Sequence, residues 1–391
     1  MARPTRIWFL TRSWWPSQTG GVLVRDAQVQ ALKKLADVHI VTPDYGGPIR
    51  DKDATVHRIP YLPSRFSQRL YGVGERLGVI PDYLSPWARR AFSYLKDKVQ
   101  AGDLVFATTG GEIGCFQLGV MLKQATSCRL VFNYHDPVTY TSVNGLVIDD
   151  RIHIRRDTLE SQYLKYADWV FTSSKTQLAA LIQKNPLLVS KSECAYFGWA
   201  APVEPLATQF AEPITLAFAG TLTRIQGIEH CAEVVARNPR FRMLIIGNWR
   251  QYTPIQAFAD HPHFSFHDSM SYEKCHAILK TQAHLGFVSL DGEYFGACFP
   301  SKIFEYINLG LPIFGALPEG DAKEVINSRG YGIATKNDVK SIEQALEGWS
   351  SLFWEQCKNK IAEERESWSL VERQSSMVAR VRELLSQKVQ S

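Results

Sequence analysis

The side chains of Ser301, Lys302 and Glu305 have the types and spacing to form an anion site beside a carboxylate. A helix that starts at Pro300, where a missing N–H costs little, would place Ser301 and Lys302 among unpaired backbone N–H groups. The helix dipole adds a partial positive charge there. Glu305 follows one turn later on the same face, and a carboxylate beside a phosphate site suits a ribose diol. The alternative is an amphipathic helix whose lysine and glutamate are solvated.

The segments around this helix fit a parallel α/β sheet. Gly310 suits the position after the helix end, and residues 311–314 are apolar like an inner parallel strand. Strand and helix patterns alternate along the rest of the chain. In the first half, strands are predicted at 7–11, 38–42, 56–59, 104–107, 129–133 and 169–172, and helices at 21–35, 86–99, 114–123, 154–166 and 176–184. In the second half, strands are predicted at 214–218, 242–246, 263–266, 285–289, 312–314 and 332–334.

An extended segment at 200–213 interrupts this alternation and predicts a linker between two Rossmann-like domains. Residues 1–205 would form the first domain and residues 206–368 the second, with a C-terminal helix at about 369–391 packing back on the first. A chain of 391 residues suits two hydrophobic cores. Because ligands bind outside the carboxyl ends of parallel strands, we expect two facing domains to share one cleft.

The composition is that of an ordinary globular protein. Hydrophobic residues make up 45% and charged residues 21%, which excludes a disordered or fibrous chain. Seven cysteines without a C-x-x-C pair argue against a disulfide framework or a zinc site and favour a reducing compartment. No apolar run reaches about 18 residues, and the N-terminus leads directly into a strand, so neither a transmembrane helix nor a signal peptide is expected. We therefore expect a cytoplasmic protein.

Five blocks of the sequence resemble, in the same order, those of glycosyltransferase family 4, particularly bacterial enzymes that build surface polysaccharides. They are a glycine loop at 16–21, His135-Asp136 after a strand, residues 159–174, residues 218–228, and the pattern P-S-K-x-x-E-Y-x-x-x-G-x-P that starts at Pro300. The resemblance covers nearly the whole chain and implies a GT-B fold, in which two Rossmann-like domains face a central cleft. It also implies transfer of a sugar from a nucleotide sugar to a lipid-linked or saccharide acceptor, with retention. No metal or other cofactor is expected.

The resemblance assigns the nucleotide sugar to the second domain. Gly220 ends a predicted strand and Gly227 opens the next helix, so the backbone there can approach a phosphate closely. Trp249 and Tyr252 follow the next strand and, by position, frame the base.

Cationic residues that the family uses at the diphosphate are missing from this chain. An arginine commonly follows the first glycine and a lysine precedes the second, whereas Thr221 and Gln226 occupy these positions. Arg224 and Lys302 remain as nearby cations, and we assign them the diphosphate; the alternative for Arg224 is a solvated loop arginine. Because neutralising the charge of the leaving group contributes strongly to catalysis, we expect the loss of two cations to lower the rate of transfer.

The sugar-side carboxylate of the family is also displaced. The family has a pair of glutamates with seven residues between them. If Glu305 is the second, the first position is occupied by Ala297. Either this carboxylate is missing, or Glu293 supplies it after a local insertion, which we prefer. The alternative for Glu293 is a solvated acid in an Asp-Gly turn.

In the first domain, four residues are expected to line the cleft. Gly20 and Gly21 precede a helix and can aim backbone N–H groups at the donor phosphate or the acceptor. The resemblance implies that His135 hydrogen-bonds the donor sugar, and that Asp136 orients the acceptor or acts as base. A structural His-Asp pair is the alternative, and Arg12 is a weaker candidate.

Residues 61–99 predict a partner surface. Its cations are interleaved with aromatic and apolar side chains, as in basic amphipathic helices that bind anionic membranes. The cations are Arg65, Arg69, Arg76, Arg89, Arg90, Lys96 and Lys98, and the apolar residues are Phe66, Leu70, Tyr71, Leu77, Trp87 and Phe92. A solvated helix face over the core is the alternative, whereas nucleic acid is disfavoured because no binding motif accompanies the charge.

Three function classes therefore compete. The leading one is a metal-independent glycosyltransferase, peripheral on the inner face of a membrane. The second is another GT-B enzyme, such as a nucleotide-sugar epimerase; a phosphorylase would need a pyridoxal phosphate lysine and a longer chain. The third is a binding protein that kept the fold, which Thr221 and Gln226 favour.

Overall fold

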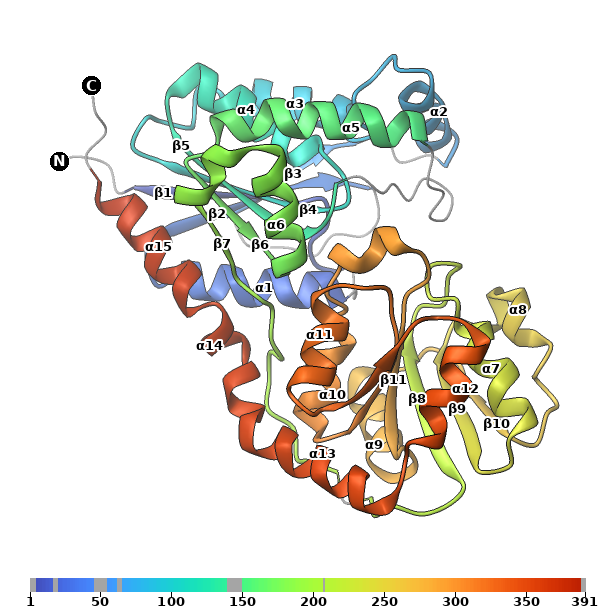
Figure 1. Cartoon of the computed structure of the whole chain (residues 1–391). Helices are drawn as coiled ribbons and strands as arrows, with labels where there is room; N and C mark the ends of the chain where they lie inside the picture. Colours follow the sequence, from blue (N-terminus) through green and yellow to red (C-terminus); the bar gives the residue numbers. More distant parts are fainter. Residues whose placement is uncertain are drawn as a thin grey trace. The chain divides into compact units, whose positions relative to one another are not determined.

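The computed structural model describes residues 5–16, 20–45, 55–61, 65–138, 150–206 and 208–387. The chain divides into two compact units, one made of Met1–Tyr196 with Gln374–Ser391 and the other of Phe197–Arg373. Each unit is a parallel sheet covered by helices (Figure 1). The α/β fold with two Rossmann-like sheets is thereby confirmed.

The first unit contains a seven-stranded parallel sheet in the order β3-β2-β1-β4-β5-β6-β7. Its strands are β1 (Arg6–Leu10), β2 (Asp37–Asp44), β3 (Val56–Pro60), β4 (Leu104–Gly110), β5 (Arg129–Asp136), β6 (Trp169–Thr172) and β7 (Ser192–Cys194). Its helices are α1 (Gly20–Leu32), α2 (Arg65–Arg76), α3 (Ser85–Leu95), α4 (Gly114–Thr126), α5 (Asp150–Tyr163), α6 (Lys175–Lys184) and α15 (Ser375–Ser386). The strand order reverses between β1 and β4, and ligands of such sheets bind outside the carboxyl ends of the strands at this point.

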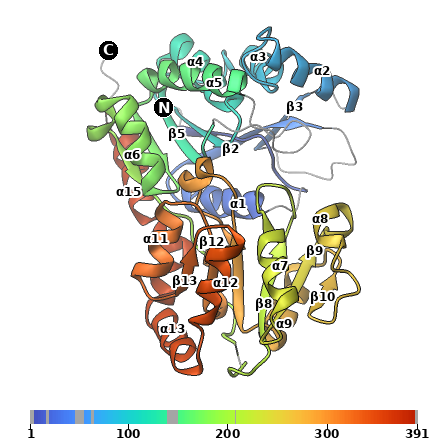
Figure 2. The ribbon, with the colours of Figure 1, turned by 45° about the vertical axis from the view of Figure 1, so that its right-hand side comes forward.

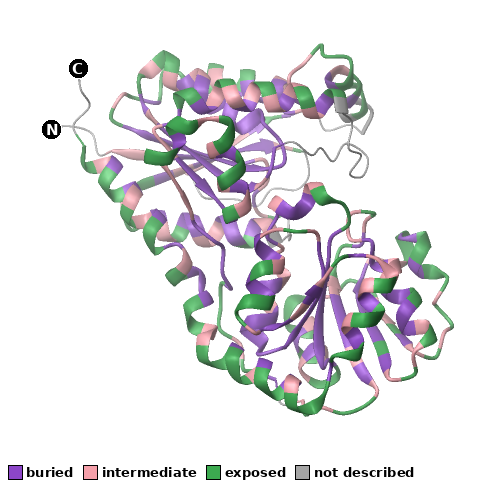
Figure 3. Cartoon of the chain, viewed as in Figure 1, coloured by how far each residue is buried: buried purple, intermediate pink, exposed green. Residues whose placement is uncertain are grey.

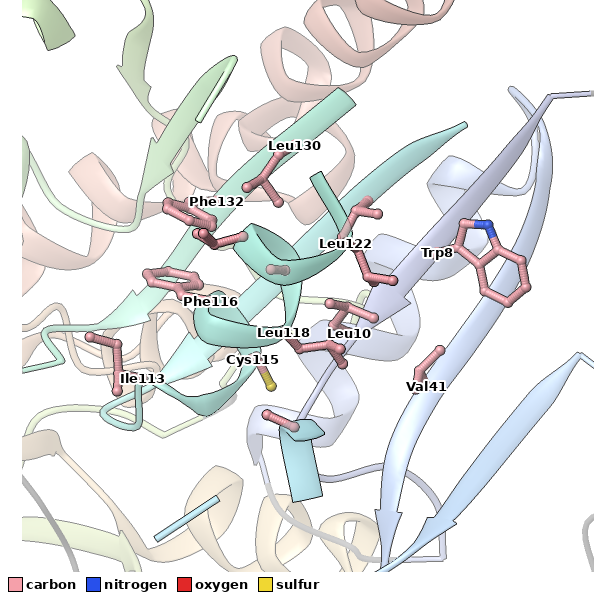
Figure 4. Close-up of a cluster of buried hydrophobic side chains, with 14 of the residues drawn as sticks. Trp8, Leu10, Val41, Ile113, Cys115, Phe116, Leu118, Leu122, Leu130 and Phe132 are labelled. Atoms are coloured by element: carbon pink, nitrogen blue, oxygen red, sulfur yellow. The ribbon is translucent and has the colours of Figure 1, made fainter. Parts of the chain in front are cut away.

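Both faces of the first sheet are apolar. Successive side chains of a strand point to opposite faces, so strands that are apolar at consecutive positions place apolar side chains on both. Trp8 and Leu10 of β1 belong to a core that α3 and α4 cover, whereas Ile7 and Phe9 belong to a core under α1 and α15. Figure 4 shows the first of these cores, in which α4 side chains pack on those of β5. The inner strands of both sheets are buried almost throughout, and the outer faces of the helices are exposed (Figure 3).

The second unit repeats this topology with six parallel strands in the order β10-β9-β8-β11-β12-β13. Its strands are β8 (Ile214–Gly220), β9 (Phe241–Gly247), β10 (Phe264–His267), β11 (Leu285–Ser289), β12 (Ile313–Ala316) and β13 (Gly332–Thr335). Its helices are α7 (Ile228–Arg237), α8 (Thr253–Gln256), α9 (Tyr272–Gln282), α10 (Lys302–Leu309), α11 (Asp321–Ser328), α12 (Val339–Glu347), α13 (Ser351–Glu364) and α14 (Leu370–Arg373). Helices α7 and α12 lie side by side (Figure 2). The order reverses between β8 and β11.

The segment expected to link the domains belongs to the second unit. Asn308 of α10 donates a hydrogen bond from Nδ2 to the carbonyl of Ala201 at 2.8 Å, and the backbone N–H of Leu206 donates to Leu309 at 2.8 Å. The chain passes between the units after Tyr196 and Arg373, whereas the sequence suggested breaks after residues 205 and 368. None of the helices that the structure describes is long and apolar enough to cross a membrane.

Candidate functional site

Helix α10 is fixed to the two strands at which the order of the second sheet reverses. The hydroxyl group of Tyr306 donates hydrogen bonds to the carbonyls of Ala217 in β8, at 2.9 Å, and Phe287 in β11, at 3.1 Å. Gly286 makes room for the Tyr306 ring, because a Cβ there would lie 2.4 Å from it. The helix ends at Gly310, whose φ of 68° is left-handed, as the sequence predicted. Its first residue, Lys302, is therefore held at the carboxyl end of β8.

The Lys302 side chain lies across the end of β8. Its Nζ atom is 4.7 Å from the centroid of the buried Phe218 ring. Gly220, the last residue of β8, has a φ of 140°, and a Cβ there would lie 3.0 Å from Nζ. Glycine at position 220 thus leaves space for the Lys302 side chain and also adopts the positive φ that this position requires.

The ammonium group of Lys302 has no acidic partner among the residues that the structure describes. Burial alone lowers its pKa to about 8, because a charged amine loses hydration there. A bound anion would replace this hydration and raise the pKa again. The arrangement is that of an anion site whose charge is not neutralised by the protein.

This pKa predicts how nucleotide affinity depends on pH. Below about pH 8 the ammonium is charged and attracts a diphosphate; above it the free site is neutral, so UDP affinity should fall with rising pH until it reaches that of Lys302→Met. Calorimetric titrations between pH 7 and 9.5 would measure this, since phosphate is already fully ionised there. The fall should disappear in Lys302→Met; a decline of equal steepness in that variant would assign it to another group.

Glu305 is held by two side chains of α9 that sequence reasoning missed. Its Oε2 atom accepts a hydrogen bond from the hydroxyl group of Tyr272 and lies 3.5 Å from Nε2 of His276. The Tyr272 and His276 rings are in contact, with centroids 3.8 Å apart and planes tilted by 47°. The Glu305 side chain is 32% exposed, so the carboxylate is oriented by α9 yet accessible to a ligand.

The loop after β8 replaces the expected cationic contacts with internal hydrogen bonds. Oε1 of Gln226 accepts from the backbone N–H of Thr223 at 2.7 Å and from its hydroxyl group at 2.8 Å. Gly227 has a left-handed φ of 52°, but its open side is occupied by protein, since a Cβ would lie 2.7 Å from Asn337 and 2.8 Å from Asp291. The close approach of a phosphate to the Gly227 backbone stays a prediction. Thr221 and Arg224 are exposed.

Two other predicted residues lie near the start of α10 in sequence. Ser301 immediately precedes the helix and is exposed, and its side chain makes no capping hydrogen bond. Glu293 opens the 3-10 helix Glu293–Ala297 and is also exposed. Within the described ranges, no hydrogen bond or ion pair joins Glu293 or Arg224 to Lys302 or Glu305.

Trp249 and Tyr252 contact other side chains of the second unit. The Trp249 ring packs against Phe266, with centroids 4.7 Å apart, and the Arg250 guanidinium lies over it at 4.5 Å. Tyr252 is buried and donates its hydroxyl hydrogen to Glu229 at 2.8 Å. Trp249 is half-buried, and that the two rings frame the base stays a prediction.

In the first unit, His135 and Asp136 form the carboxyl end of β5, as predicted. His135 is buried, and its Nε2 lies 3.1 Å from Oε1 of Gln28, which can only accept. Gln28 in turn donates to Gln374 at 2.9 Å. Burial, with Arg25 and Arg12 nearby, keeps the pKa of His135 well below its usual value, so the imidazole is neutral with its proton on Nε2.

The glycines before α1 are part of the helix start. Helix α1 begins at Gly20, and a Cβ on Gly21 would lie 3.0 Å from Nη1 of Arg25. The rest of the predicted glycine loop, residues 17–19, lies outside the described residues.

No group of three or more His, Cys, Asp or Glu side chains is arranged to hold a metal ion within the part of the chain that the structure describes. Asp51 and Asp53, which are spaced as an Asp-x-Asp pair, lie outside that part.

The surface predicted at 61–99 differs from the expectation in its apolar residues. Trp87 is fully buried, and Tyr71 and Phe92 pack on the core, so these aromatic side chains are not available to a partner. The exposed apolar residues on and directly after α2 are aliphatic. Leu70 and Val73 of α2 are 53% and 49% exposed, and Leu77, which follows the helix, is 73% exposed. Val79 follows them, and Tyr94 of α3 is 40% exposed. Arg69, Arg76, Arg89 and Arg90 are exposed. The side chains of Arg65 and Phe66 lie outside the described residues.

The orientation of α2 is set by a buried ion cluster. Arg156 of α5 is fully buried and pairs with Glu75 of α2 at 2.6 Å and with Asp82 at 2.7 Å. The pKa of Glu75 is raised to about 7, chiefly by burial and next by the Asp82 charge. Because Glu75 faces inward, the opposite face with Leu70 and Leu77 faces solvent.

Neither the family models nor the curated proteins match the sequence. Solved structures do match over almost the full chain. The Anabaena HepE protein, solved with UDP and glucose, is 13% identical with a TM-score of 0.66, covering 96% of this chain and 99% of that chain. Sucrose-phosphate synthase from Thermosynechococcus elongatus is 15% identical with a TM-score of 0.66, covering 98% and 99%. A glycosyltransferase from Rickettsia africae is 13% identical with a TM-score of 0.64, covering 99% and 100%.

The chain has the GT-B fold. Sequence identity at this level shows the fold alone, so the particular family and the reaction rest on the site residues themselves.

Proposed function

We propose that the protein is a glycosyltransferase that takes its sugar from a nucleotide sugar bound by the second unit. The observation that carries this proposal is the Lys302 ammonium, which lies without an acidic partner among the described residues, at the carboxyl end of β8 next to Gly220. Glu305, one turn later, presents a partly exposed carboxylate. An anion site followed by an acceptor of hydroxyl hydrogen bonds suits a diphosphate and its ribose.

In the proposed reaction, the bond between the sugar C1 and the diphosphate oxygen breaks, and the diphosphate leaves with the electron pair. An acceptor hydroxyl oxygen bonds to C1 on the same face, and its proton passes to the leaving phosphate, which gives retention. Lys302 stabilises the charge that develops on the diphosphate. Ser301 and Arg224, which are exposed, are assigned supporting roles at the phosphate, and Glu293 the donor sugar.

We further propose that the first unit supplies the acceptor side, with Asp136 orienting the acceptor hydroxyl. The neutral His135 imidazole is suited to hydrogen bonding rather than to carrying a charge. The acceptor is a lipid-linked or saccharide hydroxyl at the cytosolic face of a membrane, as in the surface-polysaccharide enzymes of family 4. The aliphatic and cationic face of α2 would dock there: Leu70, Val73 and Leu77 contact lipid while Arg69 and Arg76 pair with anionic headgroups.

Replacing Glu305 with glutamine should weaken UDP binding by at least about tenfold. An amide accepts weaker hydrogen bonds from a ribose diol than a carboxylate does, and bonds to charged groups are worth about 1.5–3 kcal/mol. Calorimetry with UDP and 2′-deoxy-UDP checks the assignment, because the variant should also lose most of the preference for ribose. The exposed Glu293 serves as a control at the same charge: Glu293→Gln should leave UDP affinity unchanged. Equal UDP affinity in Glu305→Gln and the parent would remove Glu305 from the site.

Two alternatives give different products in one assay. A panel of UDP-, GDP- and dTDP-sugars is incubated with and without glycan and lipid acceptors, and nucleotide and sugar are quantified. A glycosyltransferase forms a new glycosidic bond that depends on the acceptor. A nucleotide-sugar epimerase yields nucleotide and altered sugar without one, and a binding protein with the GT-B fold retains the donor unchanged.

A further inference from the structure

A second cationic site lies in the first unit, where Arg25 of α1 is buried with few partners. Its exposed fraction is 3%. Within the part of the chain that the structure describes, its guanidinium makes one hydrogen bond, from Nη1 to the Ser13 hydroxyl oxygen at 3.1 Å, and no ion pair. Its Nε is buried without a hydrogen-bond partner. A guanidinium keeps its charge at any ordinary pH, so the N–H groups that the protein leaves unsatisfied can donate hydrogen bonds to a bound anion.

Arg12 approaches the same point from the end of β1. A Cβ on Gly110, the last residue of β4, would lie 3.0 Å from Nη2 of Arg25 and 3.4 Å from Nη2 of Arg12. The two guanidinium groups therefore flank one glycine, although their charges repel. Burial and then the Arg12 charge lower the pKa of Arg25. Such a pair is stabilised when an oxyanion accepts hydrogen bonds from both.

The carboxylates nearby offset part of this charge without forming an ion pair with Arg25. Glu112 pairs with Arg12 at 3.2 Å and accepts the backbone N–H of Gly110 at 3.2 Å. Glu112 and Asp136 both lie within electrostatic range of Arg25, but within the described residues neither is joined to it by an ion pair. The position of the pair is also that of a ligand site, because β1 and β4 are the strands between which the order of the sheet reverses.

We propose that Arg25 and Arg12 bind an oxyanion of the acceptor, a phosphate or a carboxylate, so that the acceptor substrate is anionic. That the bound ligand is the acceptor rests on the proposed function, whereas the oxyanion subsite itself does not. His135 and Asp136, at the end of the adjacent β5, then lie where the rest of this ligand would extend.

The test uses the full-length protein and four probes: inorganic phosphate, glucose 6-phosphate, glucuronate and neutral glucose. Calorimetry and thermal unfolding are measured with and without UDP. Phosphate and glucose 6-phosphate, or glucuronate, should bind and raise the unfolding temperature, whereas glucose should not. Which of the two classes binds identifies the group as phosphate or carboxylate. Binding should persist with UDP present, because Lys302 and Glu305 belong to the other unit.

Arg25→Met should weaken binding of the anionic probe at least tenfold, because it removes the guanidinium N–H groups that would hold the anion. Arg25→Lys keeps the charge but loses the planar, bidentate donor geometry of the guanidinium, so it should bind the probe more weakly than the parent does. Lys34→Met, at an exposed position of the same unit, should leave binding of the probe unchanged.

Two results would overturn the subsite: no anionic probe binds, or Arg25→Met binds it as the parent does. Competition between UDP and glucose 6-phosphate would also overturn it, by placing both in one site. Loss of UDP binding in Glu305→Gln tests the proposed function separately, so either idea can fail alone.

Discussion

Lys302→Met should lower turnover at saturating donor by at least about a hundredfold while changing donor affinity much less. Methionine keeps the apolar stem against Phe218 and Gly220 but removes the charge. Negative charge grows on the diphosphate as its bond to the sugar breaks, so the ammonium interacts more strongly with the transition state than with the bound donor. Removing one preorganised donor of this type typically costs a factor of about 10² to 10³ in turnover. Steady-state kinetics with the cognate nucleotide sugar, together with calorimetry for UDP, separates the two terms.

A matched variant guards this experiment against a general effect of charge. Lys340→Met removes an exposed lysine of α12 in the same unit and should leave both parameters unchanged. Loss of turnover and affinity by the same factor in Lys302→Met would indicate uniform binding instead, and Lys302 would then be a binding residue only.

Changing Arg69, Arg76, Arg89 and Arg90 together to serine should abolish binding to anionic vesicles without altering UDP binding. Each cation near such a surface contributes about 1 kcal/mol, so four removals amount to roughly 4 kcal/mol, or nearly a thousandfold. The four side chains are exposed, and Leu70, Val73 and Leu77 add apolar contact. Sedimentation with phosphatidylserine-containing vesicles measures the loss.

The control removes equal charge from the second unit: Arg237, Arg242, Lys336 and Lys340, all exposed, are changed to serine. That variant should bind vesicles as the parent does, and parental binding should weaken with added salt. If the parent sediments equally with neutral and anionic vesicles, or with neither, the α2 face is a solvated surface and the membrane is not its partner.

The fold could be predicted because its signals are local. Apolar runs such as 285–289 match β11 to the residue, since both faces of an inner parallel strand are buried. The end of α10 followed from Gly310, which adopts a left-handed φ, whereas the helix starts at Lys302, two residues after the expected start at Pro300. β7 was missed, because Ser192–Cys194 is a short, half-buried edge strand without an apolar run.

The candidate site could be predicted only where one segment carries it. Lys302 and Glu305 lie on one helix, so their proximity follows from helical spacing. The contact of Tyr272 with Glu305 spans 33 residues of sequence. Arg25 of α1 and Gly110 of β4 are separated along the chain by β2 and β3. Neither contact therefore has a local signal. The packing of Trp249 on Phe266 also has no local signal, because position after a strand does not say whether a ring faces a ligand or a core.

The return of the chain to the first unit constrains how the molecule can be divided. Met377, Val381 and Leu384 of α15 share a core with Ile7 and Phe9 of the central strand β1. Gln374 also receives a hydrogen bond from Gln28, which holds His135. A fragment that ends at Tyr196 would leave this sheet face partly bare and the histidine's support incomplete. For the first unit to fold on its own, it therefore needs helix α15. This helix could be fused to the end of the fragment or added as a separate peptide.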